Sequence, residues 1–232
     1  MSWHLVDGVP LPDPVAGHPA LDFCNTRAGW GASTPKEYLT GPRALRLWVA
    51  EAGLLTPPPD ADLHGHTHPG SDPGSGSEGY PARLALQQAL RLREALYPAA
   101  LGRATEADWD LLSGRAAAAR AASRLEPGPV GARWRLRPGS GLAGSGPAGS
   151  GLDPTLLALH AVAAVAEELL VSPLAGCVAA CPGRGCGWLF ADPRRRRRWC
   201  SMAVCGNRAK ARRFAAARGD RPTGPDHDTL GR

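Results

Sequence analysis

Residues 181–214 read CPGRGCGWLFADPRRRRRWCSMAVCGNRAKARRF and contain two close pairs of cysteines. Cys181 and Cys186 enclose four residues, thirteen residues follow, and Cys200 and Cys205 again enclose four. Zinc binds four thiolates in a tetrahedron, and two close pairs joined by a short loop supply them at a low cost in loop-closure entropy. The glycine that follows each pair favours a tight turn. This stretch therefore predicts one structural zinc ion whose coordination shell is filled by these four cysteines.

The two remaining cysteines are Cys24 and Cys177. Cys177 competes for a ligand position because only three residues separate it from Cys181, but no glycine follows it, so we leave it out of the predicted site. Clustering of cysteines in a reducing compartment indicates metal binding before disulfides. An alternative interpretation is a thiol-based redox sensor, in which oxidation expels the zinc and cationic surroundings make the thiolates more available.

Positive charge is concentrated around the cysteine pairs. Residues 1–180 carry 14 Lys and Arg against 17 Asp and Glu, a net charge of −3, whereas residues 181–221 carry 12 against 2, a net charge of +10. Such a concentration indicates a polyanion as partner. The sequence RAKARRFAAAR at 208–218 predicts a basic helix, entered through Asn207 as a cap and ended by Gly219.

DNA is the polyanion that this arrangement favours, because a narrow helix of alanines and arginines suits phosphates and the major groove. The alternatives are an RNA- or protein-interaction module, or a solvated charge run that keeps the protein soluble. The predicted nucleic-acid contacts are Arg194, Arg195, Arg196, Arg197, Arg198, Arg208, Lys210, Arg212 and Arg213.

The hydrophobic pattern upstream is mainly helical. Helices are predicted within 18–55, over 82–97 with Pro98 as its end or kink, over 105–124 with Thr105 as its cap, and over 153–171. Residues 130–137 alternate between apolar and polar and predict a half-buried strand. Compositions rich in Gly, Pro and Ser predict loops at 56–81 and 139–151.

We therefore expect a mainly α (α+β) fold. A helical N-terminal domain, residues 1–175, contains the small β element, and a four-cysteine zinc module, residues 176–221, ends in the basic helix. Residues 222–232 are expected to form a flexible tail. The tryptophans expected in the core, because most lie in periodic apolar patterns, are Trp30, Trp48, Trp109 and Trp134.

Asn25 and Thr26 close the first predicted helix and allow two interpretations. They cap the helix and fix the next loop, which is the favoured interpretation because buried polar pairs are usually bonded internally. Alternatively, they line a pocket through which the N-terminal domain senses a small molecule or a protein.

Other classes of protein are less compatible with the sequence. The N-terminus has no basic start followed by an apolar run, and the longest apolar stretch, near 156–171, contains a histidine and two glutamates, so we expect a cytoplasmic protein without a membrane span. No catalytic motif stands out, and we do not expect an enzyme. Because one small finger rarely suffices for specific recognition, a homodimer formed through the helical domain is a reasonable hypothesis.

Two stretches of the chain resemble known families. Residues 199–210, WCSMAVCGNRAK, together with CGWLF at 186–190, closely resemble the CGNR zinc finger. LDFCNT at 21–26 resembles the ABATE domain that precedes this finger in proteins described as stress-induced transcriptional regulators. The resemblance implies the same four zinc ligands and a role in binding DNA. The loop between Asp192 and Trp199 is shorter here than is usual in the family, and Cys24 stands where an aliphatic residue is common.

Overall fold

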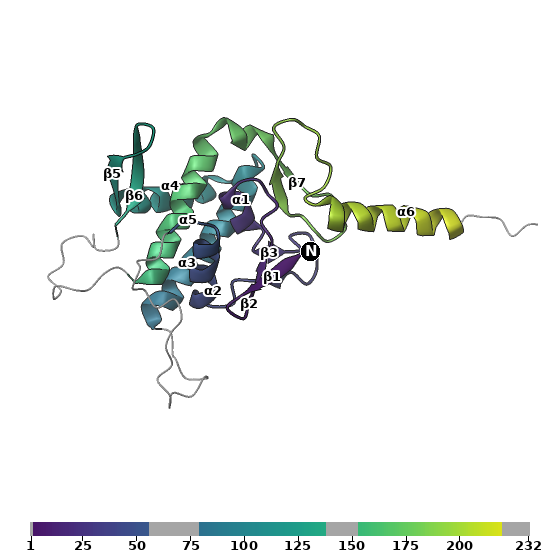
Figure 1. The fold of residues 1–232 in the computed structure, drawn as a ribbon, viewed down its shortest axis with the longest axis horizontal. Coiled ribbons are helices and arrows are strands. Elements are labelled where there is room, and N and C mark those ends of the chain that lie inside the picture. Colours follow the sequence, from purple (N-terminus) through teal and green to yellow (C-terminus); the bar gives the residue numbers. More distant parts are fainter. Residues whose placement is uncertain (1, 56–78, 138–152, 220–232) are drawn as a thin grey trace, which may run out of the picture.

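The computed structural model describes residues 2–55, 79–137 and 153–219, which form a helical body and a smaller C-terminal module. The helices of the body are α1 (Pro19–Cys24), α2 (Pro42–Glu51), α3 (Tyr80–Ala100), α4 (Glu106–Ala121) and α5 (Pro154–Val171). Helix α5 lies in the middle of the body and packs against α2, α3 and α4 (Figure 1). The predicted loop at 139–151, the predicted tail and nearly all of the predicted loop at 56–81 lie outside the described residues.

Local sequence accounts for the ends of these helices. The Asp153 carboxylate accepts hydrogen bonds from the first turn of α5, and Thr105 and Asp108 form a reciprocal capping box at the start of α4. Pro98 was expected to end or kink α3, but it lies in the last turn, and the helix ends two residues later at Ala100.

Helix α5 is apolar on nearly all sides because other helices surround it. Within the described part of the chain it is also the one helix whose length and composition would allow it to cross a bilayer, although its histidine and two glutamates were expected to exclude this. More than half of it, 56%, is buried inside the protein, as in the core helix of a globular fold.

The strands of the described residues form separate two-stranded antiparallel sheets, which confirms the mainly α (α+β) class. The pairs are β1 (Trp3–Val6) with β2 (Val9–Pro12), β3 (Arg27–Ala28) with β4 (Lys36–Glu37), β5 (Ser123–Pro127) with β6 (Ala132–Leu136), and β7 (Val178–Ala180) with β8 (Leu189–Ala191). In the last pair Ala179 lies opposite Phe190.

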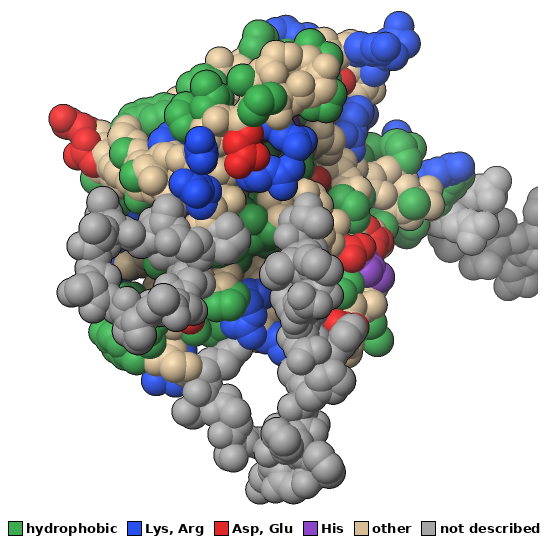
Figure 2. Space-filling view, turned by 60° about the vertical axis from the view of Figure 1, so that its left-hand side comes forward, with side chains coloured by type: hydrophobic (Ala, Val, Ile, Leu, Met, Phe, Trp, Pro, Cys, Tyr) green, Lys and Arg blue, Asp and Glu red, His purple; other side chains and the backbone are tan. Residues whose placement is uncertain are grey.

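The β5–β6 hairpin corrects two predictions. The helix predicted to reach residue 124 ends at Ala121, because the following residues pair with β6. The strand is not half-buried: Val130 is 94% exposed and Trp134 is 51% exposed, with the Arg120 guanidinium 5.0 Å from its ring centroid. Figure 2 shows the side of the molecule that carries this hairpin in Figure 1, where hydrophobic side chains lie among Lys and Arg. Trp109 is also exposed, so Trp48 is the fully buried member of the four tryptophans expected in the core.

The C-terminal module shares its core with the body. Leu189 and Ala191 of β8 belong to the main hydrophobic core, together with residues of α1 and α5. A second buried cluster joins the four paired cysteines, Trp188 and Phe190 to Ala28 and Tyr38 from the N-terminal part of the chain. The helical body and the C-terminal module therefore pack together across the predicted domain boundary near residue 175.

After β8 the chain continues through a loop to a π-helical turn, η2 (Met202–Gly206), and directly into α6 (Asn207–Gly219). Asn207 was expected to cap α6, but it has helical backbone angles and its side chain donates to the Ala203 carbonyl oxygen. The helical segment thus begins at Met202, six residues before the expected start at Arg208. Helix α6 projects away from the body (Figure 1).

Candidate metal centre

The first cysteine pair lies at the tip of the β7–β8 hairpin. The backbone N–H of Cys181 donates to the Trp188 carbonyl oxygen at 2.8 Å, which extends the strand pairing up to the pair. The N–H of Cys186 donates to the Gly183 carbonyl oxygen at 2.8 Å and closes the turn between the two cysteines. Gly183 is tightly enclosed, since an added Cβ atom would lie 3.1 Å from the sulfur of Cys205. The turn therefore brings the first pair against the second.

The second pair is held by the start of the C-terminal helical segment. Cys200 ends the arginine-rich loop, and Cys205 lies in η2, where its N–H donates to the Ser201 carbonyl oxygen at 3.0 Å. All four sulfurs lie within 4.8 Å of one another, and no cysteine of this cluster is more than 4% exposed.

The spacing of the sulfurs fits zinc. Cys200 Sγ lies 3.7 Å from both Cys186 Sγ and Cys205 Sγ. Zn–S bonds of about 2.3 Å in a tetrahedron place sulfurs roughly 3.8 Å apart. Four thiolates fill the coordination shell and leave no position for a substrate or a water molecule. The donor set and its geometry are those of one structural zinc ion, as the sequence predicted.

The four buried thiols influence one another's pKa because they are in contact. Hydrogen bonds from Cys186 and Cys200 lower the pKa of Cys181 to about 2. The hydrogen bond to Cys181, together with burial, raises the pKa of Cys186 to about 12. Hydrogen bonds to Cys181 and Cys186, together with burial, also raise the pKa of Cys200. Without a metal, one thiolate is therefore stabilised at the expense of its neighbours. A bound Zn²⁺ would replace the shared protons and allow all four sulfurs to be thiolates.

Neither remaining cysteine belongs to the cluster. Cys177 lies at the end of the 3₁₀ helix η1 (Pro173–Cys177), and its thiol faces the Pro173 carbonyl oxygen at 4.0 Å. Cys24 is fully buried in the main core, and burial strongly raises the pKa of its thiol, which therefore behaves as a small apolar side chain.

An aromatic pair of the body fixes the first zinc-binding turn. The rings of Trp30 and Tyr97 stack with centroids 3.8 Å apart. Tyr97 donates its hydroxyl hydrogen to the Gly187 carbonyl oxygen at 2.7 Å, and the backbone N–H of Trp30 donates to the Cys186 carbonyl oxygen at 3.3 Å. Gly187 has a positive φ of 68°, and an added Cβ atom would lie only 2.8 Å from the Cβ atom of Trp30. Glycine is required here by both backbone conformation and space.

Asn25 connects the body to β8 directly. Its amide donates to the Leu189 carbonyl oxygen at 2.9 Å and accepts from the Leu189 N–H at 2.8 Å. Both residues are fully buried. The side chain of Asn25 thus acts like one residue of a neighbouring strand, and it satisfies two backbone groups of the zinc-binding hairpin.

Thr26 belongs to a neighbouring buried network. Its hydroxyl donates to the Phe23 carbonyl oxygen and accepts from Arg93, whose guanidinium also pairs with Glu37. Asn25 and Thr26, the candidate pocket residues, therefore lie in the interior with internal partners, as the favoured interpretation of a buried, internally bonded polar pair anticipates.

The predicted nucleic-acid contacts fall into two groups. Arg197 has an internal role, because its guanidinium donates to the carbonyl oxygens of Val15 and Cys200 and lies 4.7 Å from the ring centroid of Phe190. It links the N-terminal segment, the zinc site and β8. All nine residues are exposed, and the eight besides Arg197 are Arg194, Arg195, Arg196, Arg198, Arg208, Lys210, Arg212 and Arg213.

A buried four-cysteine centre built into a helical body defines a zinc-finger protein. Comparison with known families agrees: residues 178–218 match the CGNR zinc finger. Residues 17–173 match ABATE, which is described as "Putative stress-induced transcription regulator". The chain thus belongs to the ABATE family and carries a CGNR zinc finger at its C-terminal side, which confirms the resemblance seen in the sequence. No curated protein matches the chain.

Proposed function

We propose that this protein is a DNA-binding transcriptional regulator whose zinc ion fixes the base of a projecting basic helix to the rest of the fold. The observation that carries the proposal is the exposure of α6: its described side chains are nearly all exposed, and they include Arg208, Lys210, Arg212 and Arg213. A basic helix that projects from the protein and carries no acidic side chain matches the electrostatic character of duplex DNA.

The proposal assigns no catalytic role. All four zinc ligands are protein thiolates, so the metal has no open position at which to activate water. We further propose that the body senses a ligand or partner, that the protein acts as a homodimer, and that it resides in the cytoplasm. A reducing cytoplasm keeps the zinc-binding thiols available, and two fingers supply more base contacts than one.

Fluorescence anisotropy with the zinc-loaded full chain and a labelled DNA duplex tests the proposal. If about four to eight phosphates are contacted, raising the salt from 50 to 200 mM weakens binding by roughly 10²- to 10⁴-fold. The full chain is needed because the module and the body share a core. A duplex RNA of equal length is the matched competitor. Equal competition by RNA, or binding that salt leaves unchanged, contradicts the proposal.

A further inference from the structure

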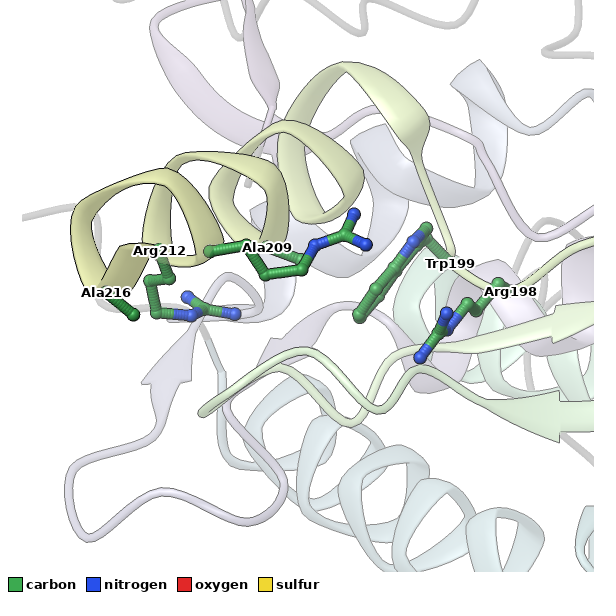
Figure 3. A pocket seen from close by; sticks show the side chains of 6 residues that line it. Arg198, Trp199, Ala209, Arg212 and Ala216 are labelled. Carbon is green, nitrogen blue, oxygen red and sulfur yellow. The ribbon is translucent and has the colours of Figure 1, made fainter. Parts of the chain in front are cut away.

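A groove separates α6 from the residues that precede Cys200. It encloses about 280 Å³, and its lining residues are Arg198, Trp199, Ala209, Arg212, Arg213 and Ala216. The four that belong to α6 follow one another at helical spacings of three, one and three residues, so they form a single stripe of the helix. Figure 3 shows Arg212 and Ala216 on α6 on one side of Trp199 and Arg198 on the other side.

The groove has an apolar and a cationic part. Two alanines and the half-buried indole of Trp199 supply the apolar lining, and Arg198, Arg212 and Arg213 supply the cationic lining, here called the rim. No acidic side chain lines it, and within the described part of the chain these three arginines make no ion pair. Asp192, the acidic residue of the described module, is turned to the backbone N–H groups of Arg196 and Arg197 instead.

We propose that this groove binds one sugar–phosphate unit of a duplex DNA backbone. The phosphate lies among the three guanidinium groups, and the deoxyribose packs against Trp199. Arginine guanidinium groups bind phosphate oxygens in a bidentate manner, and phosphate contacts of this kind set the register of a protein on DNA. The inference rests on the proposed function and names the point at which the backbone is held.

The dimensions and the surroundings of Trp199 favour a backbone unit over other anions. At about 280 Å³ the groove approaches the range of roughly 300–1,000 Å³ typical of small-molecule sites, which is more room than an inorganic ion requires. Stacking of an unpaired base needs an open aromatic face. The Arg198 guanidinium already lies 5.5 Å from the ring centroid of Trp199, and α6 faces the opposite side. A sugar against the exposed part of the ring fits this arrangement, with α6 beside the major groove.

Two double variants with equal loss of charge test the inference. Arg212→Ala with Arg213→Ala removes two rim groups, whereas Arg208→Ala with Lys210→Ala removes two charges from the rest of α6. In the zinc-loaded full chain, we expect the rim variant to bind a labelled duplex at least tenfold more weakly than the control variant. We also expect the slope of log affinity against log salt to fall in magnitude by about 1 in the rim variant, because one phosphate contact is lost. Zinc content verifies that both variants fold.

Tryptophan emission supplies the second measurement. We expect duplex DNA to change the emission of the wild-type protein, and Trp199→Phe to abolish most of that change while zinc remains bound. Equal affinities for the two double variants, or an emission change that survives in Trp199→Phe, would show that the groove is not the backbone-binding site and would leave the proposed function standing. A wild-type protein that binds no duplex overturns both. Groove-dependent binding of single strands alone overturns the assignment to a duplex backbone.

Discussion

Replacing Asn25 with alanine tests the connection between the body and the zinc-binding hairpin. The amide of Asn25 holds both the N–H and the C=O of Leu189, with distances of 2.8 and 2.9 Å. Alanine retains none of these contacts and leaves two backbone groups buried without partners, since Leu189 is 0% exposed. Water cannot replace the amide unless the hairpin separates from α1.

The expected loss of stability follows from the two backbone groups of Leu189 that lose their hydrogen-bond partner. A buried donor or acceptor that loses its partner costs about 1–3 kcal/mol, so the substitution should lower the free energy of unfolding by roughly 2–5 kcal/mol. Because a domain is stable by only about 5–15 kcal/mol, this loss is a large part of the total. The same substitution should speed the transfer of zinc to a chelator, because separation of β8 from the body also loosens the first cysteine pair.

Urea unfolding of the zinc-loaded chain, followed by tryptophan emission, measures the first effect, and a colorimetric chelator measures the second. Asn207→Ala is the matched control, because this exposed asparagine lies in the same module and its amide makes a single hydrogen bond to a carbonyl. We expect the control to lose less than about 1 kcal/mol. A loss below about 0.5 kcal/mol in Asn25→Ala, with unchanged zinc release, would refute the structural role of this contact.

Three further predictions concern the same part of the molecule. Burial raises the pKa of Asp22 to about 6 from an ordinary value of 3.8, so the folded state binds more protons than the unfolded state. The free energy of unfolding should therefore fall by up to roughly 3 kcal/mol as the pH rises from about 4 to 6. Asp22→Asn keeps an oxygen acceptor and should remove this fall, which urea titrations at several pH values measure; an unchanged pH dependence contradicts it. Gly187→Ala should lower the free energy of unfolding by about 2–4 kcal/mol. Gly53→Ala, with a similar positive φ but open space around it, should lower it by about 1–2 kcal/mol, and equal losses in the two variants would show that steric contact at Gly187 is unimportant. Elemental analysis should find one zinc per chain in the wild type and in Cys177→Ala but none in Cys200→Ala, and zinc retained in the last variant would contradict the ligand set.

The metal centre could be predicted from the sequence because its ligands are close together in the chain. The prediction of the zinc ligands depended mostly on the four-residue gap between Cys181 and Cys186 and the equal gap between Cys200 and Cys205. The helices of the body were also predictable in type, since their apolar periods extend over many residues. The end of α4 was missed because the residues after Ala121 adopt a strand through pairing with β6, and that pairing depends on the hairpin rather than on local propensity.

The junction between body and module could not be predicted from the sequence. Asn25 and Leu189 are separated by 164 positions, and neither shows a signal that depends on the other. Trp30 and Tyr97 were likewise missed as supports of the first zinc-binding turn, because their stacking depends on the three-dimensional fold. Arg197 is one of five consecutive arginines, and only the fold distinguishes the one whose guanidinium contacts backbone carbonyls from neighbours that face solvent.

The shared core indicates which half of the module depends most on zinc. The β7–β8 hairpin is held by the body independently of the metal, through Asn25, the Trp30–Tyr97 pair and the burial of Leu189. The segment that carries Cys205 packs less against the body, because the described side chains of α6 are nearly all exposed and Phe214 is 62% exposed. Zinc therefore acts mainly as the joint that fixes α6 to an already folded hairpin. Loss of the metal should release the basic helix while the body and hairpin persist, so that zinc occupancy controls the geometry of the proposed DNA contact more than the stability of the helical body.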